Sequence, residues 1–267
     1  MASSSIRGRS AAGILSLVLV LTSCAASGQA TSPSVGPPDK PKATSTTASP
    51  VHMGSGRARR GSYTAKDWVT NADYVVAVEA VSESRVGPSK REIERGEGMI
   101  GRLVELSVSE VLWSAPRAAV AAPSSFKMQV AGWTFGSDDR SIEESLAKPV
   151  RFVLEESSRI EVGHSYVMAI EWVDDACYSD PALGSWAGLG PGDTIPYDAG
   201  ELGAGEFEGI VQTRAEAQAR WRKDPSNPSL RGAASLMSFE ELKAVLAAAQ
   251  GESRLEFPAE CDLADRP

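Results

Sequence analysis

Alternating apolar and polar residues mark out much of the middle of the chain. The clearest case lies between Arg102 and Trp113, where Val104, Leu106 and Val108 are separated by polar residues. A period of two is typical of a strand that buries one face. The same alternation predicts strands over residues 126–131 and 166–172, and the β-branched residues of 74–81 predict another. Residues 151–154 and 208–212 are two further short strand candidates. The sequence therefore predicts a mainly β domain of five to six antiparallel strands.

Two stretches beside these strands carry the signals of helices. Thr64 and Asp67 fit an N-cap and its acidic partner, and they predict a short helix that ends near Ala72. Ser238 and Glu241 form a capping box near the C-terminus. The apolar residues that follow it at helical spacing are Phe239, Leu242, Val245, Leu246 and Ala249. We expect the apolar stripe of this amphipathic helix to pack on the strands.

The N-terminus has the pattern of an export signal. Arg7 and Arg9 precede an apolar run over residues 11–21, which is too short to span a membrane. The residues that follow, Leu21-Thr22-Ser23-Cys24, resemble the lipobox of bacterial lipoproteins. This resemblance implies a signal peptide over residues 1–23 and a lipid on Cys24 that holds the protein at the extracytoplasmic face of the cell membrane. The alternative is an ordinary secretory signal that is cleaved nearby.

Residues 24–62 consist almost entirely of Ala, Ser, Thr, Pro and Gly. Such a stretch buries too little apolar surface to offset its conformational entropy. We therefore expect a disordered tether, followed by a single folded domain over residues 63–267. A small basic cluster lies in the tether at Lys40, Lys42, Arg57, Arg59 and Arg60. It is either a contact for anionic lipid headgroups or plain solvated charge.

The arrangement from residue 72 to residue 172 resembles the netrin and tissue-inhibitor modules. The matching segments are ADYVV at 72–76, VSEVLWS at 108–114 and VGHSYVMAI at 162–170. This resemblance implies an OB-like antiparallel barrel. It does not extend to protease inhibition, because the inhibitory cysteine of that family lies at the mature N-terminus. Here that position belongs to Cys24, which is acylated if the lipobox is real and lies far from the domain.

The charge and the cysteines restrict the partners. The chain has 27 basic and 35 acidic residues and a net charge of −8, which argues against nucleic acid as a partner. With Cys24 lipidated, Cys177 and Cys261 remain, and an even pair in an exported protein predicts a disulfide bond. Two free buried thiols are the alternative. The two histidines, His52 and His164, have no cysteine or histidine at ligand spacing, so we expect no zinc site.

Paired carboxylates and aromatic residues are the remaining candidates for chemistry. The carboxylates fall in predicted loops at Asp138-Asp139, Glu143-Glu144, Asp174-Asp175 and Asp180. Solvation of these loops explains them, with calcium binding or acid–base catalysis as alternatives. Trp186 and Tyr197 lie in a Gly- and Pro-rich segment over residues 180–205, which we expect to be an ordered surface loop. They either anchor this loop or form a platform for a sugar or a peptide.

These observations predict a lipid-anchored envelope protein that is not an enzyme. It has no cofactor, no metal and no catalytic residue, and it binds a protein or a glycan outside the membrane. The alternative is an extracellular hydrolase that uses loop carboxylates such as Asp174 and Asp180 on envelope glycans.

Overall fold

The computed structural model describes residues 51–56, 60–136, 140–174, 184–223 and 229–255. These ranges belong to one unit of the chain, Thr47–Pro267. Cys24, Cys177 and Cys261 lie outside the described residues, so the lipid anchor and the disulfide stay predictions. None of the helices in the described ranges is both long enough and apolar enough to cross a membrane.

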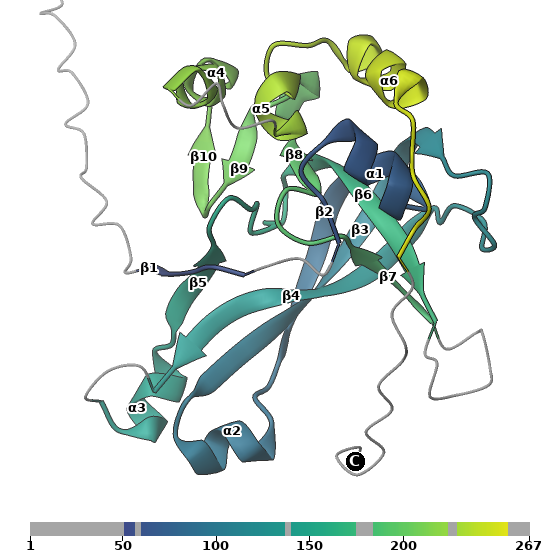
Figure 1. The fold of residues 1–267 in the computed structure, drawn as a ribbon. Helices are drawn as coiled ribbons and strands as arrows, with labels where there is room; N and C mark the ends of the chain where they lie inside the picture. Colours follow the sequence, from purple (N-terminus) through teal and green to yellow (C-terminus); the bar gives the residue numbers. More distant parts are fainter. Residues whose placement is uncertain (1–50, 57–59, 137–139, 175–183, 224–228, 256–267) are drawn as a thin grey trace, which may run out of the picture. The chain divides into compact units, whose positions relative to one another are not determined.

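An eight-stranded, mostly antiparallel sheet forms the centre of the fold (Figure 1). Its strand order is β1-β5-β4-β3-β2-β6-β7, and β8 also pairs with β6. The strands are β1 (Val51–Gly54), β2 (Tyr74–Val86), β3 (Gly98–Ser114), β4 (Ser125–Phe135), β5 (Val150–Leu154), β6 (Ser165–Val173), β7 (Ser185–Gly188) and β8 (Thr194–Pro196). A separate hairpin consists of β9 (Gly205–Phe207) and β10 (Ile210–Gln212).

The predicted OB-like barrel is wrong, because the sheet is open. β1 and β7 stand at the two ends of the strand order and do not pair with each other in the described residues. A barrel closes only when its first and last strands share a ladder of hydrogen bonds. Here the outer edge of β5 is already paired with β1. Alternation along one strand is the same in an open sheet and in a barrel, so the pattern could not distinguish them.

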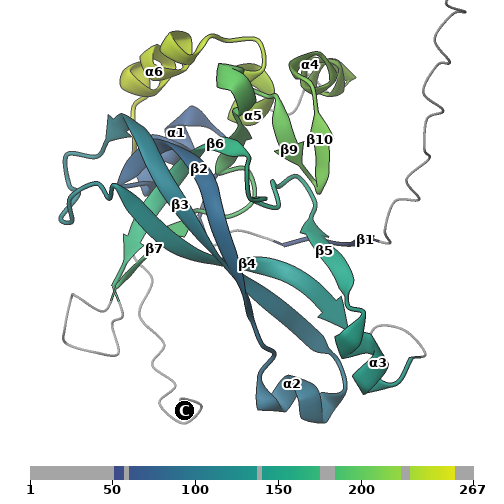
Figure 2. The same cartoon turned by 180° about the vertical axis from the view of Figure 1, so that it is seen from behind.

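In the described residues six α-helices accompany the sheet, which makes the fold mixed α/β rather than mainly β. They are α1 (Ala65–Asn71), α2 (Lys90–Arg95), α3 (Ile142–Ala147), α4 (Arg214–Lys223), α5 (Leu230–Ala234) and α6 (Phe239–Ala248). The two predicted helices, α1 and α6, are confirmed, and each begins with the capping box identified in the sequence. Figures 1 and 2 show α2 and α3 at the end of β3 and β4 that lies away from α1 and α6.

The other four helices have no counterpart in the prediction. α2 and α3 have six residues each and α5 has five, which is too short to establish a helical period. α4 has ten residues, but it is polar all round and buries no residue completely. Its stability must come from contacts with the rest of the fold rather than from an apolar stripe.

Part of the segment assigned to the tether belongs to the sheet. Val51–Gly54 forms β1, which pairs in parallel with β5 along its whole length. Val51 and Met53 remain 45% and 53% exposed. Backbone hydrogen bonds rather than side-chain burial therefore hold this strand. Ser62 is fully buried, so the ordered chain begins before Tyr63, the predicted start of the domain.

The segment expected to be a surface loop is partly core. Its described part contains β7, β8 and a short 3₁₀ helix over Asp198–Gly200. Ile195 and Leu202 within it are almost completely buried. Strands of three or four residues produce hardly any alternation, so glycine and proline dominated the sequence pattern.

Two buried clusters cover the two faces of the sheet. One face packs against α1, α5 and α6 through Trp68, Leu230, Leu242 and Leu246. The opposite face holds a second cluster that includes Val104, Leu106, Tyr166, Met168 and Ile170. Neighbouring residues of β2 alternate between the clusters, since Val75 belongs to the first and Val76 to the second. A strand buried on both faces explains the continuous apolar run in this part of the sequence.

Candidate functional site

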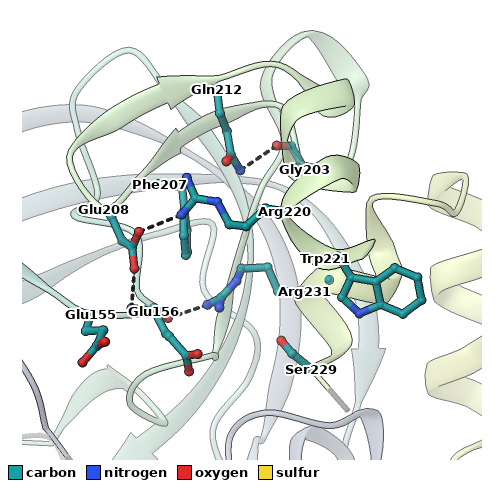
Figure 3. A pocket seen from close by; sticks show the side chains of 12 residues that line it. Glu155, Glu156, Gly203, Phe207, Glu208, Gln212, Arg220, Trp221, Ser229 and Arg231 are labelled. Carbon is teal, nitrogen blue, oxygen red and sulfur yellow. Dashed lines mark hydrogen bonds and ion pairs between the residues drawn. The ribbon is translucent and has the colours of Figure 1, made fainter. Parts of the chain in front are cut away.

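A cavity of about 250 Å³ lies between the β9–β10 hairpin, α4, the start of α5 and the turn that follows β5 (Figure 3). We call it the hairpin pocket. Its lining residues include Glu156, Phe207, Glu208, Gln212, Arg220, Trp221 and Arg231. Most of them come from consecutive elements within residues 203–232, and the turn after β5, about 50 residues earlier, completes the wall. Tertiary packing therefore creates this site.

The hairpin itself is a tight two-residue turn. Phe207 pairs with Ile210, and the two residues between them, Glu208 and Gly209, have φ values of 52° and 78°. This is the pattern of a type I′ turn, in which both central residues have positive φ. Glycine adopts this conformation freely, but a glutamate there costs free energy.

A second glutamate in the same strained conformation faces the hairpin. Glu156, in the turn after β5, has a φ of 55°. Glu208 holds the two turns together, because its Oε1 accepts a hydrogen bond from the Glu156 backbone N at 2.8 Å. The Glu208 backbone N in turn donates to the carbonyl oxygen of Ser157 at 3.1 Å. Backbone strain persists only where surrounding contacts enforce it, and it is concentrated at functional sites.

The two cations of the pocket are both engaged. Arg220 donates from Nη1 to Glu208 Oε2 at 2.7 Å, and Arg231 donates from Nη1 to the backbone carbonyl of Glu156. Their guanidinium carbons lie 4.7 and 4.4 Å from the ring centroid of the buried Phe207. Burial lowers the pKa of Arg231, because the charged form loses hydration, and the nearby Glu156 and Glu208 carboxylates partly oppose this.

Two polar atoms in the pocket wall are buried without a partner. Trp221 Nε1 and Gln212 Oε1 have no hydrogen bond within the described part of the chain. Gln212 is held in place by its other side-chain atom, since Nε2 donates to the Gly203 carbonyl at 3.1 Å. The Trp221 indole packs directly against α5. Position 232 accommodates only glycine, because a Cβ there would clash with the indole. An unsatisfied buried donor or acceptor costs about 1–3 kcal/mol, and in a native structure it calls for an explanation, such as a bound water or a bound ligand.

Comparisons with known proteins do not identify a family or a function for this chain. No known protein family, curated protein or solved structure matches the chain.

Trp186 and Tyr197, the residues predicted as a platform, lie apart from this pocket and are not brought together. Trp186 is 8% exposed and packs edge-on against Tyr74 and Trp172, with ring centroids 5.7 and 5.2 Å away. Tyr197 packs on the opposite face of the sheet, where its ring stacks on Phe239 of α6 at 4.8 Å. This placement favours the anchoring role for both residues.

The predicted carboxylates that the structure describes, Glu143, Glu144 and Asp174, do not line the pocket either. Glu143 and Glu144 form the first turn of α3, and Asp174 accepts a hydrogen bond from Trp172 Nε1 at 2.7 Å. Asp138, Asp139, Asp175 and Asp180 lie outside the described residues. The described ranges contain no cluster of three or more His, Cys, Asp or Glu that would suit a metal ion.

His164 and Asp198 form a pair that the sequence analysis missed. His164 Nδ1 lies 2.5 Å from Asp198 Oδ2, and the backbone N of Ser165 donates to Asp198 Oδ1 at 2.8 Å. The two contacts join the start of β6 to the 3₁₀ turn. The pair could not be recognised in the sequence because its partners are 34 positions apart, and its contacts are those that hold two segments together.

A second cavity, also of about 250 Å³, opens where β4 and β5 diverge. Those strands pair only at Trp133–Arg151 and Thr134–Val150. Beyond this point apolar residues such as Val130, Phe152 and Met168 line the space, and Asp193 closes one side. Burial raises the pKa of Asp193 to about 6, which the hydrogen bonds from Thr194 and the Gly190 backbone only partly offset.

Asp193 should make the stability of the protein depend on pH. Its pKa is raised in the folded state, so ionisation favours unfolding as the pH rises from about 4 to about 6. The expected loss is about 3 kcal/mol over this window, at 1.36 kcal/mol per pKa unit. Urea unfolding of the wild type and of Asp193→Asn at several pH values measures it. The free energy of unfolding of the wild type minus that of Asp193→Asn should fall by this amount between about pH 4 and pH 6. It should stay constant at higher pH. A difference that is independent of pH would contradict the buried ionisation.

Proposed function

We propose that this protein is a lipid-anchored envelope protein whose domain binds a protein or glycan ligand in the hairpin pocket. A lipid on Cys24 fixes it to the extracytoplasmic face of the cell membrane. The observation that carries the binding role is the pair of unpartnered polar atoms, Trp221 Nε1 and Gln212 Oε1, in the wall of one cavity. The lipobox-like segment Leu21–Cys24 supports the location.

The engagement of Glu208 favours binding over carboxylate-dependent hydrolysis. Paired-carboxylate hydrolases need one carboxyl group to donate a proton and another to act as nucleophile or base. Both oxygens of Glu208 already accept hydrogen bonds, from the Glu156 backbone and from Arg220. A carboxylate held in this way organises the pocket.

The anchor is tested by replacing one atom. In cells that express the full chain, the Cys24→Ser variant should be lost from the membrane fraction. The serine hydroxyl does not accept the diacylglycerol that the cysteine thiol would. A palmitate analogue should label the wild type and not the variant. Labelling of the Cys24→Ser variant, or wild-type protein that is found wholly in the medium, would contradict the anchor.

The pocket is tested with full-length protein on envelope material that has been separated into glycan and protein fractions. Gln212→Met removes the unpartnered acceptor and should abolish retention of the bound fraction. Gln218→Met is the matched control, because Gln218 donates from Nε2 to the Ser235 carbonyl at 2.8 Å but does not line the pocket. Equal retention by wild type and Gln212→Met would refute the proposed site. Turnover of a glycan fraction that Asp174→Asn abolishes would support the hydrolase instead.

A further inference from the structure

We propose that the ligand of the hairpin pocket is an uncharged, hydroxyl-rich group, a single sugar residue of an envelope glycan. This inference rests on the proposed function of the pocket and specifies the chemistry of what it binds. Figure 3 shows the arrangement that carries it: the two arginines point to partners within the wall, Gln212 lies above them, and the Trp221 ring lies to their right, beside α5.

The charges of the pocket disfavour an anionic ligand. Arg220 is occupied by the Glu208 carboxylate, and Arg231 by the backbone carbonyl of Glu156. Three carboxylates, those of Glu155, Glu156 and Glu208, belong to the lining. A phosphate or carboxylate ligand would approach these negative charges and would have to compete with Glu208 for its arginine.

The two unpartnered atoms, Trp221 Nε1 and Gln212 Oε1, require opposite hydrogen-bonding partners from the ligand. Trp221 Nε1 is only a donor, so it needs an acceptor from the ligand. Gln212 Oε1 is only an acceptor, so it needs a donor. An ammonium group has no acceptor, and an ionised carboxylate has no donor. Hydroxyl groups supply both roles, and a sugar ring carries several of them on an uncharged frame.

The size of the pocket agrees with one ring. Pockets that hold drug-sized ligands have volumes of roughly 300–1,000 Å³. The hairpin pocket, at about 250 Å³, lies just below that range. Ordered water molecules, one at each atom, would also satisfy them, so the experiment has to separate bound water from a bound sugar.

The experiment uses the purified full chain in detergent and a panel of methyl glycosides of glucose, galactose, mannose and N-acetylglucosamine. Saturation-transfer NMR and calorimetric titration detect binding. We expect at least one of these sugars to bind, and its counterpart with a carboxylate at C6 to bind at least tenfold more weakly. Trp221→Phe and Gln212→Met should each weaken binding about tenfold, since each removes one hydrogen bond to the ligand. Trp221→Phe should not lower the melting temperature of the free protein, because it removes only an unsatisfied buried polar atom. Gln212→Met also removes the Nε2 hydrogen bond to the Gly203 carbonyl, so we expect a small decrease in its melting temperature.

Matched controls come from elsewhere in the chain. Trp133→Phe and Gln218→Met change the same residue types outside the pocket and should leave sugar binding unchanged. Equal or stronger binding of the carboxylated sugar would overturn the uncharged ligand. Failure of all the sugars to bind, with Gln212-dependent retention of envelope material intact, would overturn the sugar and leave the proposed function standing. Loss of that retention as well would overturn both.

Discussion

Replacing Arg102 with methionine should lower the free energy of unfolding by about 3–5 kcal/mol, because it breaks a buried ionic network. Arg102 is fully buried on β3. Its guanidinium donates to Glu83 at 2.7 Å, to the Ile160 carbonyl at 3.0 Å and to the Ala131 carbonyl at 3.2 Å. Methionine fills similar space but leaves the buried carbonyl groups without donors. Urea unfolding followed by circular dichroism measures the loss.

Arg85→Met is the control for this substitution. Arg85 is exposed on β2, and its guanidinium carbon lies 4.3 Å from the centroid of the Trp133 ring. An exposed cation–π contact contributes about 0.5–1 kcal/mol, so this variant should stay close to the wild type. If both variants lost the same free energy of unfolding, burial of the Arg102 guanidinium would not explain the loss.

Replacing Glu206 with leucine should also cost about 3–5 kcal/mol, and it should disrupt the hairpin pocket. Glu206 is 1% exposed at the base of the β9–β10 hairpin. Its Oε2 accepts from the backbone N of Arg159 at 2.8 Å and of Ile160 at 3.2 Å, and its Oε1 accepts from Gly209 at 2.6 Å. The Tyr166 hydroxyl lies 3.2 Å from Oε2 as well. Leucine leaves these donors buried without an acceptor.

The readout for Glu206→Leu separates local from global effects. Hydrogen exchange over residues 205–212 should increase more than exchange in β2 and β3, since the lost contacts hold the hairpin to the sheet. Retention of envelope material should fall with it. Glu201→Leu, an exposed position before the hairpin, should change stability by less than about 0.5 kcal/mol. Unchanged exchange in the hairpin of Glu206→Leu would refute its role as the attachment point.

Features that depend on a few neighbouring residues could be predicted from the sequence. The capping boxes at Thr64 and Ser238 begin α1 and α6, because a cap is satisfied by residues three positions away. The alternation between Arg102 and Trp113 lies within β3, because side chains on a strand point to opposite faces in turn. Strand 208–212 was only half right, since Glu208 and Gly209 form the turn and β10 begins at Ile210.

The candidate site could not be predicted in the same way. The hairpin pocket needs Glu156, Glu208, Arg220 and Arg231, and the polar helix α4 carries no apolar period to reveal it. Gly209 favours a turn, but the sequence predicted a strand over residues 208–212, which included it. The unpartnered state of Trp221 Nε1 is a property of its surroundings, so no local pattern contains it.

The sequence by itself determined the caps and the inner strands, because a short stretch of chain specifies each of them. The export signal and its lipobox-like cysteine also lie in a short stretch, and they stay predictions. Only the tertiary structure decided that the sheet stays open and that a strand from the predicted tether covers β5. It alone also placed two strained glutamates and two arginines around one cavity. Closure, edge pairing and pocket formation depend on contacts between residues far apart in the chain, and the periodicity of a single segment does not record them.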